Sequence, residues 1–204
     1  SKPPPQVPLY ANIWAQAVEK HGNRQALVYA GVGPELSFTY NELESNINRL
    51  CRQLRGKYGV GQGDIIVTIV ENRPELIGLM MACQKIGCAF VPLASDLAVK
   101  DCRTIVNMYE PKLLISDQPQ HRDFPHPSGT GTWPSMFLNA YRQEQCELDK
   151  LMSEGSDEPV EITVDRNDPG IIFSTSGSTG MPKGVVYSHN AMATLAGFPI
   201  MAVE

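Results

Sequence analysis

Ten residues near the C-terminal end of this chain combine hydroxyl groups, glycines and a lysine. They read Thr175-Ser176-Gly177-Ser178-Thr179-Gly180-Met181-Pro182-Lys183-Gly184, with four hydroxyls, three glycines and one lysine. Hydroxyls and backbone amides donate hydrogen bonds, glycines let the backbone approach a ligand closely, and the lysine supplies a positive charge. These groups predict a loop that binds a polyphosphate, and therefore a nucleotide ligand.

The spacing of this loop differs from two common phosphate-binding motifs. A Walker A loop has four residues between its first glycine and the sequence Gly-Lys-Ser/Thr, and a dinucleotide loop needs Gly-x-Gly-x-x-Gly at the start of a helix. Neither spacing occurs here. The flanking runs Gly170 to Phe173 and Gly184 to Tyr187 are short and rich in β-branched and aromatic residues, which is typical of strands. We therefore expect the loop to join two strands.

The loop resembles the signature of the adenylate-forming superfamily, which comprises acyl- and aryl-CoA synthetases, luciferases and the adenylation domains of nonribosomal peptide synthetases. Residues 175–184 match every element of the family pattern Ser/Thr-Ser-Gly-Ser/Thr-Thr-Gly-x-Pro-Lys-Gly. Two upstream segments, Phe38 to Leu43 and Lys85 to Leu93, resemble further family motifs in the expected order. The resemblance extends over nearly all of the chain, from about Tyr10 onward.

The resemblance implies a reaction in which a carboxylate attacks the α-phosphate of MgATP. The products would be an acyl adenylate and pyrophosphate, and a thiol would then displace AMP. The hydroxyl or amide donors to the phosphates would be Thr175, Ser176, Ser178 and Thr179. Gly177 and Gly180 would let the backbone close in, and Lys183 would neutralise the terminal phosphates. The implied cofactors are ATP, Mg²⁺ and coenzyme A, and we assign no catalytic residue and no metal ligand to this chain.

One departure from the family pattern bears on the substrate. Peptide-synthetase adenylation domains usually follow the second motif with Asp-Pro-x-x-Pro, whereas this chain has Leu93-Ala94-Ser95-Asp96-Leu97. This favours an acid:CoA ligase, with a small-molecule carboxylic acid and coenzyme A as partners. Two alternatives stay open: an amino-acid adenylation domain of a peptide synthetase, and a non-catalytic ATP-binding or regulatory module. The identity of the acid and of the acceptor thiol is open as well.

The length of the chain predicts a fragment, and its charge and hydropathy disfavour a nucleic-acid-binding or membrane-spanning protein. The chain has 204 residues, less than half of a complete family member, and the later family motifs do not follow Gly184. We therefore expect an N-terminal fragment that needs the C-terminal part of its own chain for activity. A net charge of −5 disfavours a nucleic-acid partner, which usually meets a basic surface. No apolar run approaches the length that a membrane span requires.

The cysteines and histidines predict no metal site. Five cysteines with irregular spacing and no Cys-x-x-Cys pair indicate small buried thiols in a reducing compartment. This favours a cytoplasmic location, although an organellar one stays open. His189 follows Ser188, a helix-capping residue, and is expected to orient or pack against its neighbours.

Helix and strand patterns alternate along the chain, which predicts an α/β fold with a mostly parallel sheet flanked by helices. We expect strands at Gln25 to Tyr29, Ile65 to Val70, Cys88 to Leu93 and Lys112 to Ser116. Helices are expected from Asn12 to Lys20, after Thr39 with Glu42 as a capping box, after Pro74, and from Lys100 to Met108. The expected organisation is a leader at 1–9, an α/β subdomain at 10–116, a long connection at 117–161 with one helix from Ser135 to Met152, and the truncated start of an ATP-binding subdomain at 162–204.

Overall fold

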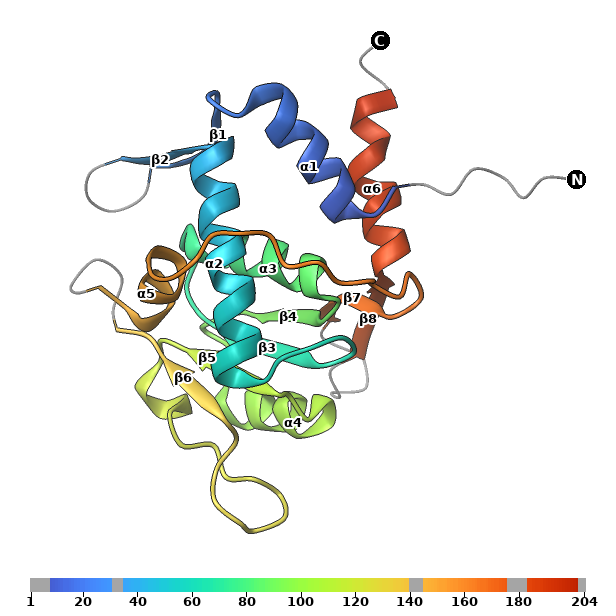
Figure 1. The fold of residues 1–204 in the computed structure, drawn as a ribbon. Coiled ribbons are helices and arrows are strands. Elements are labelled where there is room, and N and C mark those ends of the chain that lie inside the picture. Colours follow the sequence, from blue (N-terminus) through green and yellow to red (C-terminus); the bar gives the residue numbers. More distant parts are fainter. Residues whose placement is uncertain (1–7, 31–34, 140–144, 176–182, 202–204) are drawn as a thin grey trace, which may run out of the picture.

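A central sheet of six strands lies between two layers of helices in the computed structural model, which describes residues 8–30, 35–139, 145–175 and 183–201 (Figure 1). The strand order is β6 (Ser135–Phe137), β5 (Leu113–Ser116), β3 (Ile65–Ile69), β4 (Ala89–Leu93), β7 (Pro169–Thr175) and β8 (Lys183–Ser188). Neighbouring strands are parallel, except that β8 runs antiparallel to β7. The predicted α/β class with a mostly parallel sheet is confirmed.

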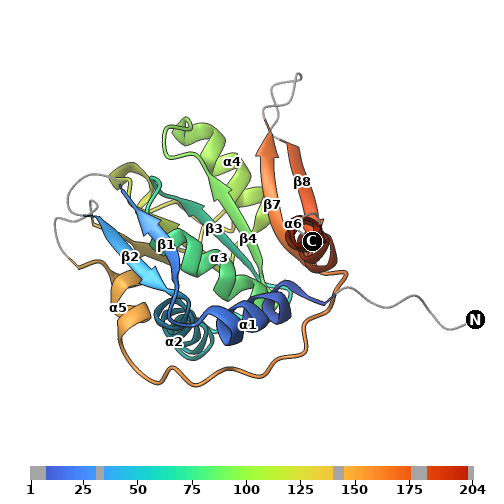
Figure 2. The same ribbon diagram turned by 90° about the horizontal axis from the view of Figure 1, so that it is seen from above.

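The helices divide between the two faces of the sheet (Figure 2). They are α1 (Tyr10–His21), α2 (Tyr40–Tyr58), α3 (Glu75–Ile86), α4 (Val99–Tyr109), α5 (Glu147–Ser153) and α6 (His189–Met201), with a 3₁₀ turn at Pro119–His121. Helices α2 and α3 cover one face, and α4 covers the other. A separate antiparallel hairpin, β1 (Gln25–Tyr29) and β2 (Leu36–Thr39), precedes α2. Among the described residues, no helix combines the length and apolar character needed to cross a bilayer.

Four of the five residues of strand β3 are aliphatic, and the packing of the strand shows why. Ile66 packs with α2 and α3 on one face, whereas Val67 and Ile69 pack with α4 on the opposite face. All three side chains are fully buried. Successive side chains of a strand point to opposite faces, so a strand covered on both faces carries apolar residues on both of them. Thr68 is the one polar residue of β3, and it is buried as well.

Local signals define helix α2 at both ends. The Thr39 hydroxyl accepts a hydrogen bond from the Glu42 amide at 3.2 Å, and the Glu42 carboxylate accepts one from the Thr39 amide at 2.8 Å. This is the predicted capping box, which satisfies two backbone donors that the first turn leaves free. The helix ends at Tyr58 and is followed by Gly59, whose φ of 63° lies in the left-handed region that glycine adopts at low cost.

Two expected helices differ from the structure. The expected helix from Ser135 to Met152 is wrong in its first part, because residues 135–137 form β6 and pair in parallel with β5. Edge pairing satisfies this backbone, and the buried Met136 side chain extends the core. The first helix begins at Tyr10, ahead of the expected Asn12 cap. Strands from residues 10–116, 117–161 and 162–204 all contribute to the one sheet.

The five cysteines are buried free thiols, in agreement with the expected burial: Cys51, Cys83, Cys88, Cys102 and Cys146. Burial raises the pKa of Cys51 to about 12, and it raises the pKa values of Cys102 and Cys146 to about 11. The thiolate is the form that reacts with alkylating agents, so the native thiols are both shielded and protonated near neutral pH.

We therefore predict that native protein at pH 8 reacts with fewer than about one equivalent of a thiol reagent, because burial suppresses the thiolate. The same protein unfolded in denaturant without reductant should yield five thiols, the number in the sequence. The measurement is an absorbance titration with an aromatic disulfide before and after unfolding. Fast reaction of two or more native thiols would contradict the buried placement.

Candidate functional site

The polyphosphate-binding loop predicted from the sequence begins and ends on the β7–β8 hairpin. Thr175 ends β7, Lys183 begins β8, and the two residues pair directly across the strands. The Thr175 hydroxyl donates a hydrogen bond to the Lys183 carbonyl oxygen at 3.3 Å. Both residues are exposed. The expectation that the loop joins two strands is confirmed, and the hairpin presents the loop at the carboxyl end of β7.

The structure brings two of the seven predicted site residues together. Thr175 and Lys183 face each other at the mouth of the loop, with the Lys183 ammonium group open to solvent. The other five, Ser176, Gly177, Ser178, Thr179 and Gly180, lie outside the described residues. Because β7 runs parallel to β4, and β4 to β3, Thr175 lies at the side of the sheet where the carboxyl ends of these strands meet. Open parallel sheets bind ligands at this edge.

Two helices hold the opposite end of the hairpin. Gln84 of α3 donates to the Gly170 carbonyl at 2.9 Å and accepts a hydrogen bond from His189 Nδ1 at 3.0 Å. The His189 amide also donates to the Asp168 carbonyl at 3.0 Å. His189 is 2% exposed, so it acts as the packing and orienting residue expected from its sequence position. The start of β7 is thereby fixed to the α3 side of the core.

Burial lowers the pKa of His189, while Asp165 and Asp168 act in the opposite direction. The folded protein therefore binds fewer protons at this site than the unfolded chain as pH falls through the ordinary histidine range near 6.5. The contribution of His189 to stability is full above this range and declines below it.

We predict that His189→Asn, which keeps a side-chain amide donor, is more destabilising at pH 7.5 than at pH 5.5. Protonation penalises only the folded wild-type protein, so the gap between the two proteins narrows as pH falls. Urea unfolding of the wild type and the variant at each pH measures the difference between their free energies of unfolding. Titrating groups that the two proteins share contribute equally to both and cancel in this difference. A gap that is constant or widens toward pH 5.5 would refute the prediction.

An open groove of about 550 Å³ lies at the carboxyl ends of β3 and β4. Its lining includes the carboxylates of Glu71 and Asp96 and, within the described part of the chain, neither a lysine nor an arginine. Asp117 fixes one wall by accepting a hydrogen bond from the Glu71 amide at 3.0 Å. Acidic walls repel a polyphosphate, so this groove is a poor candidate for a phosphate site.

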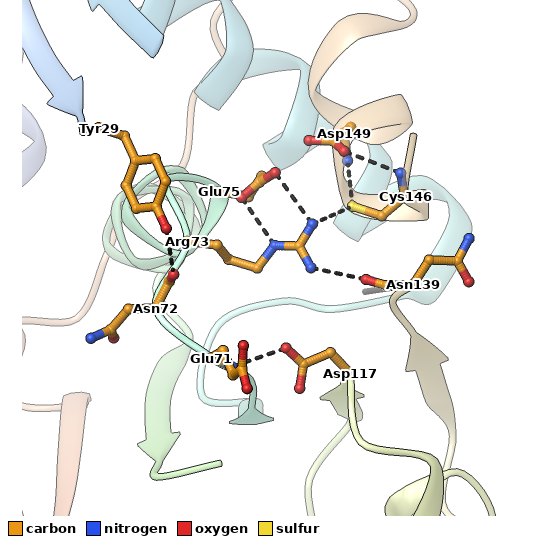
Figure 3. Close-up of polar contacts among 9 residues, drawn as sticks. All are labelled: Tyr29, Glu71, Asn72, Arg73, Glu75, Asp117, Asn139, Cys146 and Asp149. Carbon is orange, nitrogen blue, oxygen red and sulfur yellow. Dashed lines mark hydrogen bonds and ion pairs between the residues drawn. The ribbon is translucent and has the colours of Figure 1, made fainter. Parts of the chain in front are cut away.

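A buried polar cluster that the sequence did not predict surrounds Arg73 (Figure 3). Its guanidinium group donates to the Glu75 carboxylate at 3.1 and 3.4 Å, to the Asn139 carbonyl at 3.3 Å and to the Cys146 sulfur at 3.3 Å. Cys146 also caps α5 by accepting a hydrogen bond from the Asp149 amide at 3.4 Å. The cluster joins residues that lie more than 60 positions apart in sequence, as the separation of Arg73 from Asn139 shows.

Three possible metal-binding groups meet in this cluster. Ligand atoms of Glu75, Cys146 and Asp149 lie within 4.8 Å of one another. Burial raises the pKa of Glu75, the neighbouring Asp149 carboxyl raises it further, and Arg73 opposes both. The Arg73 guanidinium group already occupies the position of a cation among these groups. The cluster therefore serves to hold α5 and the end of β6 against α3.

The α/β fold with its mostly parallel sheet defines the class of architecture, and comparison with known proteins identifies the family. A family model described as AMP-binding enzyme matches residues 14–201. The chain belongs to the AMP-binding enzyme family. The family resemblance predicted from the sequence motifs is confirmed.

Curated relatives include large peptide synthetases. Nonribosomal peptide synthetase SidE of Aspergillus fumigatus is 32% identical over 176 residues, which is 86% of this chain and 8% of that protein. Tyrocidine synthase 2 of Brevibacillus parabrevis is 27% identical over 186 residues, which is 91% of this chain and 5% of that protein. The chain thus spans a small part of the curated relatives it matches.

Solved structures agree with the fold. The NpsA N-terminal subdomain of Klebsiella oxytoca matches with a TM-score of 0.71 and 26% identity, over 93% of this chain and 45% of that one. The fatty acyl CoA synthetase of Mycobacterium tuberculosis matches with a TM-score of 0.71 and 21% identity, over 89% of this chain and 34% of that one. The second likeness concerns the fold alone.

Proposed function

We propose that this chain takes part in the ATP-dependent activation of a small-molecule carboxylic acid to an acyl adenylate. The observation that supports this most directly is the β7–β8 hairpin. It holds Thr175 and Lys183 as facing residues at the two ends of a segment that matches the family signature. The family match over residues 14–201 supports the same chemistry.

The groups on the hairpin suit the polyphosphate part of MgATP. Negative charge increases on pyrophosphate as it leaves the α-phosphorus, and hydrogen-bond donors with a nearby ammonium group stabilise that charge. The exposed Lys183 side chain would reach the terminal phosphates, while the hydroxyls of Thr175, Ser176, Ser178 and Thr179 would act as donors. Mg²⁺ would be held largely through phosphate oxygens and water, and it would neutralise part of the phosphate charge.

We propose that the chain works as part of a longer protein. The described residues include no group that we assign to adenine, ribose or the acid. The relatives are longer as well: the chain covers 45% of the NpsA N-terminal subdomain and 8% of SidE. In this proposal the phosphates bind on the β7–β8 hairpin, and a following part of the protein supplies the remaining contacts.

Two acceptor thiols each have a supporting observation. Peptide synthetases dominate the relatives, and an artificially fused adenylation–PCP di-domain, NpsA-ThdA from Klebsiella oxytoca, matches with a TM-score of 0.73 and 26% identity. This supports a carrier-protein thiol as acceptor. The segment Leu93 to Leu97, which departs from the usual peptide-synthetase pattern, supports coenzyme A. We propose the carrier-protein thiol as the first candidate and coenzyme A as the second.

The test of this function is acid-dependent exchange of labelled pyrophosphate into ATP, in the longest natural protein that contains residues 1–204. A panel of amino, aryl and fatty acids identifies the substrate, and thioester formation is then compared with coenzyme A and with a phosphopantetheinylated carrier protein. Exchange with one class of acid supports adenylation. MgATP binding without exchange for any acid would instead support the non-catalytic ATP-binding or regulatory module.

We also propose a reducing compartment, the cytoplasm, on the ground that all five cysteines are buried free thiols. Fractionation of cells that express the tagged full-length protein tests this. Recovery in a secretory compartment would count against it.

A further inference from the structure

The side chain of Tyr109 packs against the start of β8 at Gly184, although the two residues are far apart in sequence. It is the last residue of α4, and its ring packs in the same apolar cluster as Ile172 of β7. A Cβ atom placed on Gly184 would lie 2.0 Å from the Tyr109 hydroxyl oxygen, 3.2 Å from its Cζ and 3.1 Å from Ile172 Cγ2. The phenol therefore fills the space that a side chain at position 184 would need.

The contact occurs one residue pair below the mouth of the phosphate loop. Gly184 pairs across the hairpin with Ser174, and the next pair is Thr175 with Lys183. A lateral shift of the backbone at Gly184 would move Lys183 with it, because the two residues are adjacent. The phenol thus supports the backbone that presents the cation.

Two buried hydroxyls at this level have no hydrogen-bond partner among the described residues. They are Tyr109 Oη and Ser174 Oγ. Most buried polar groups in proteins are hydrogen-bonded, and an unpaired hydroxyl under a strand costs stability. A tyrosine at this position is therefore not explained by stability, since phenylalanine would fill the apolar space without the unpaired oxygen.

We propose that Tyr109 is a positioning residue for the phosphate site. Its hydroxyl oxygen contacts the Gly184 backbone and holds the start of β8 so that Lys183 reaches the terminal phosphates of ATP. Glycine at 184 is the other half of this contact, since only a residue without Cβ accommodates the phenol. This inference rests on the proposed binding of ATP at the hairpin.

The inference predicts an energetic coupling between positions 109 and 184, which a double-mutant cycle measures. Gly184→Ala should raise the KM for MgATP in pyrophosphate exchange by about ten-fold or more, because small displacements at a site are costly. Tyr109→Phe removes the oxygen that meets the new methyl group. The double variant should therefore recover at least about three-fold of that loss, a non-additive effect of residues in contact. The KM for the acid should change less than about two-fold in every variant, since the contact serves the phosphates.

Tyr187→Phe provides a matched control, because it removes a hydroxyl from another residue of β8. Combined with Gly184→Ala, it should give no recovery. All variants are measured in the longest natural protein that contains this chain, with thermal unfolding to confirm folding. If Gly184→Ala does not fold, Tyr109→Phe alone decides: a KM for MgATP raised about two-fold or more supports the inference, and an unchanged KM overturns it.

The outcomes separate this inference from the proposed function. If the wild-type protein exchanges pyrophosphate but the double variant shows no recovery of the KM for MgATP, the role of Tyr109 is overturned and the proposed function stands. Equal recovery in the control double variant Gly184→Ala/Tyr187→Phe also overturns the role of Tyr109 and leaves the proposed function standing. A wild-type protein that neither exchanges pyrophosphate nor binds MgATP overturns both.

Discussion

Replacing Arg73 with methionine is expected to lower the free energy of unfolding by about 3 to 5 kcal/mol at pH 7.5, as for other buried ion pairs that lose one partner. The side chains of Arg73 and Glu75 are 1% and 9% exposed, so water cannot replace the lost guanidinium group. The Glu75 carboxylate would be left buried beside Asp149 without its cation. The Asn139 carbonyl would also lose the hydrogen bond that Arg73 donates.

The pH dependence of this loss identifies its cause. Burial already raises the pKa of Glu75, and Arg73 is the group that opposes this rise. Without Arg73 the pKa rises further, so the variant binds a proton on folding near neutral pH. Stability of the variant relative to wild type should therefore increase as pH falls from 7.5 to 5. Urea unfolding at the two pH values measures the change.

Arg52→Met is the matched control. Arg52 also pairs with a carboxylate, that of Glu158, but these side chains are 40% and 80% exposed. Exposed pairs contribute about 0 to 1 kcal/mol, so this variant should change stability little and without the pH effect. A double variant Arg73→Met/Glu75→Leu should recover part of the loss, because it removes the buried charge as well. Similar small losses at positions 73 and 52 would show that the Arg73 cluster adds nothing to stability.

Replacing Lys183 with alanine is expected to slow acid-dependent pyrophosphate exchange by about ten-fold or more in the longest natural protein that contains this chain. The estimate corresponds to the loss of one hydrogen bond to a charged group, worth about 1.5 to 3 kcal/mol. Lys183 is exposed and starts an edge strand, so its removal should leave the thermal unfolding temperature nearly unchanged. The loss would thus concern the ligand and not the fold.

Two further variants sharpen the result. Lys112→Ala removes an exposed lysine just before β5, on the side of the sheet where the amino ends of the parallel strands lie, and should leave exchange unchanged. Lys183→Arg keeps the charge on a planar group, so partial activity is expected. Wild-type exchange in Lys183→Ala would remove this residue from the phosphate site. An equal effect of Lys112→Ala would point to net charge instead of a specific contact.

The sequence by itself determined the local elements of this protein. The Thr39 and Glu42 pair specifies a helix start through contacts three residues apart, and the mostly aliphatic run of β3 specifies a strand buried on both faces. Such signals depend on neighbouring residues, and therefore a single chain is enough to find them. The nucleotide prediction has the same origin, since the loop from Thr175 to Gly184 is contiguous.

Only the tertiary structure decided which distant residues meet. Nothing near Arg73 in sequence indicates Cys146, and nothing near Gly184 indicates Tyr109, yet each pair is in contact. The same holds for β6, a three-residue strand whose backbone pairs with β5 inside a segment expected to be helical. These contacts follow from the strand order and from how the helices cover the sheet. They depend on the packing of the whole chain, which local periodicity does not encode.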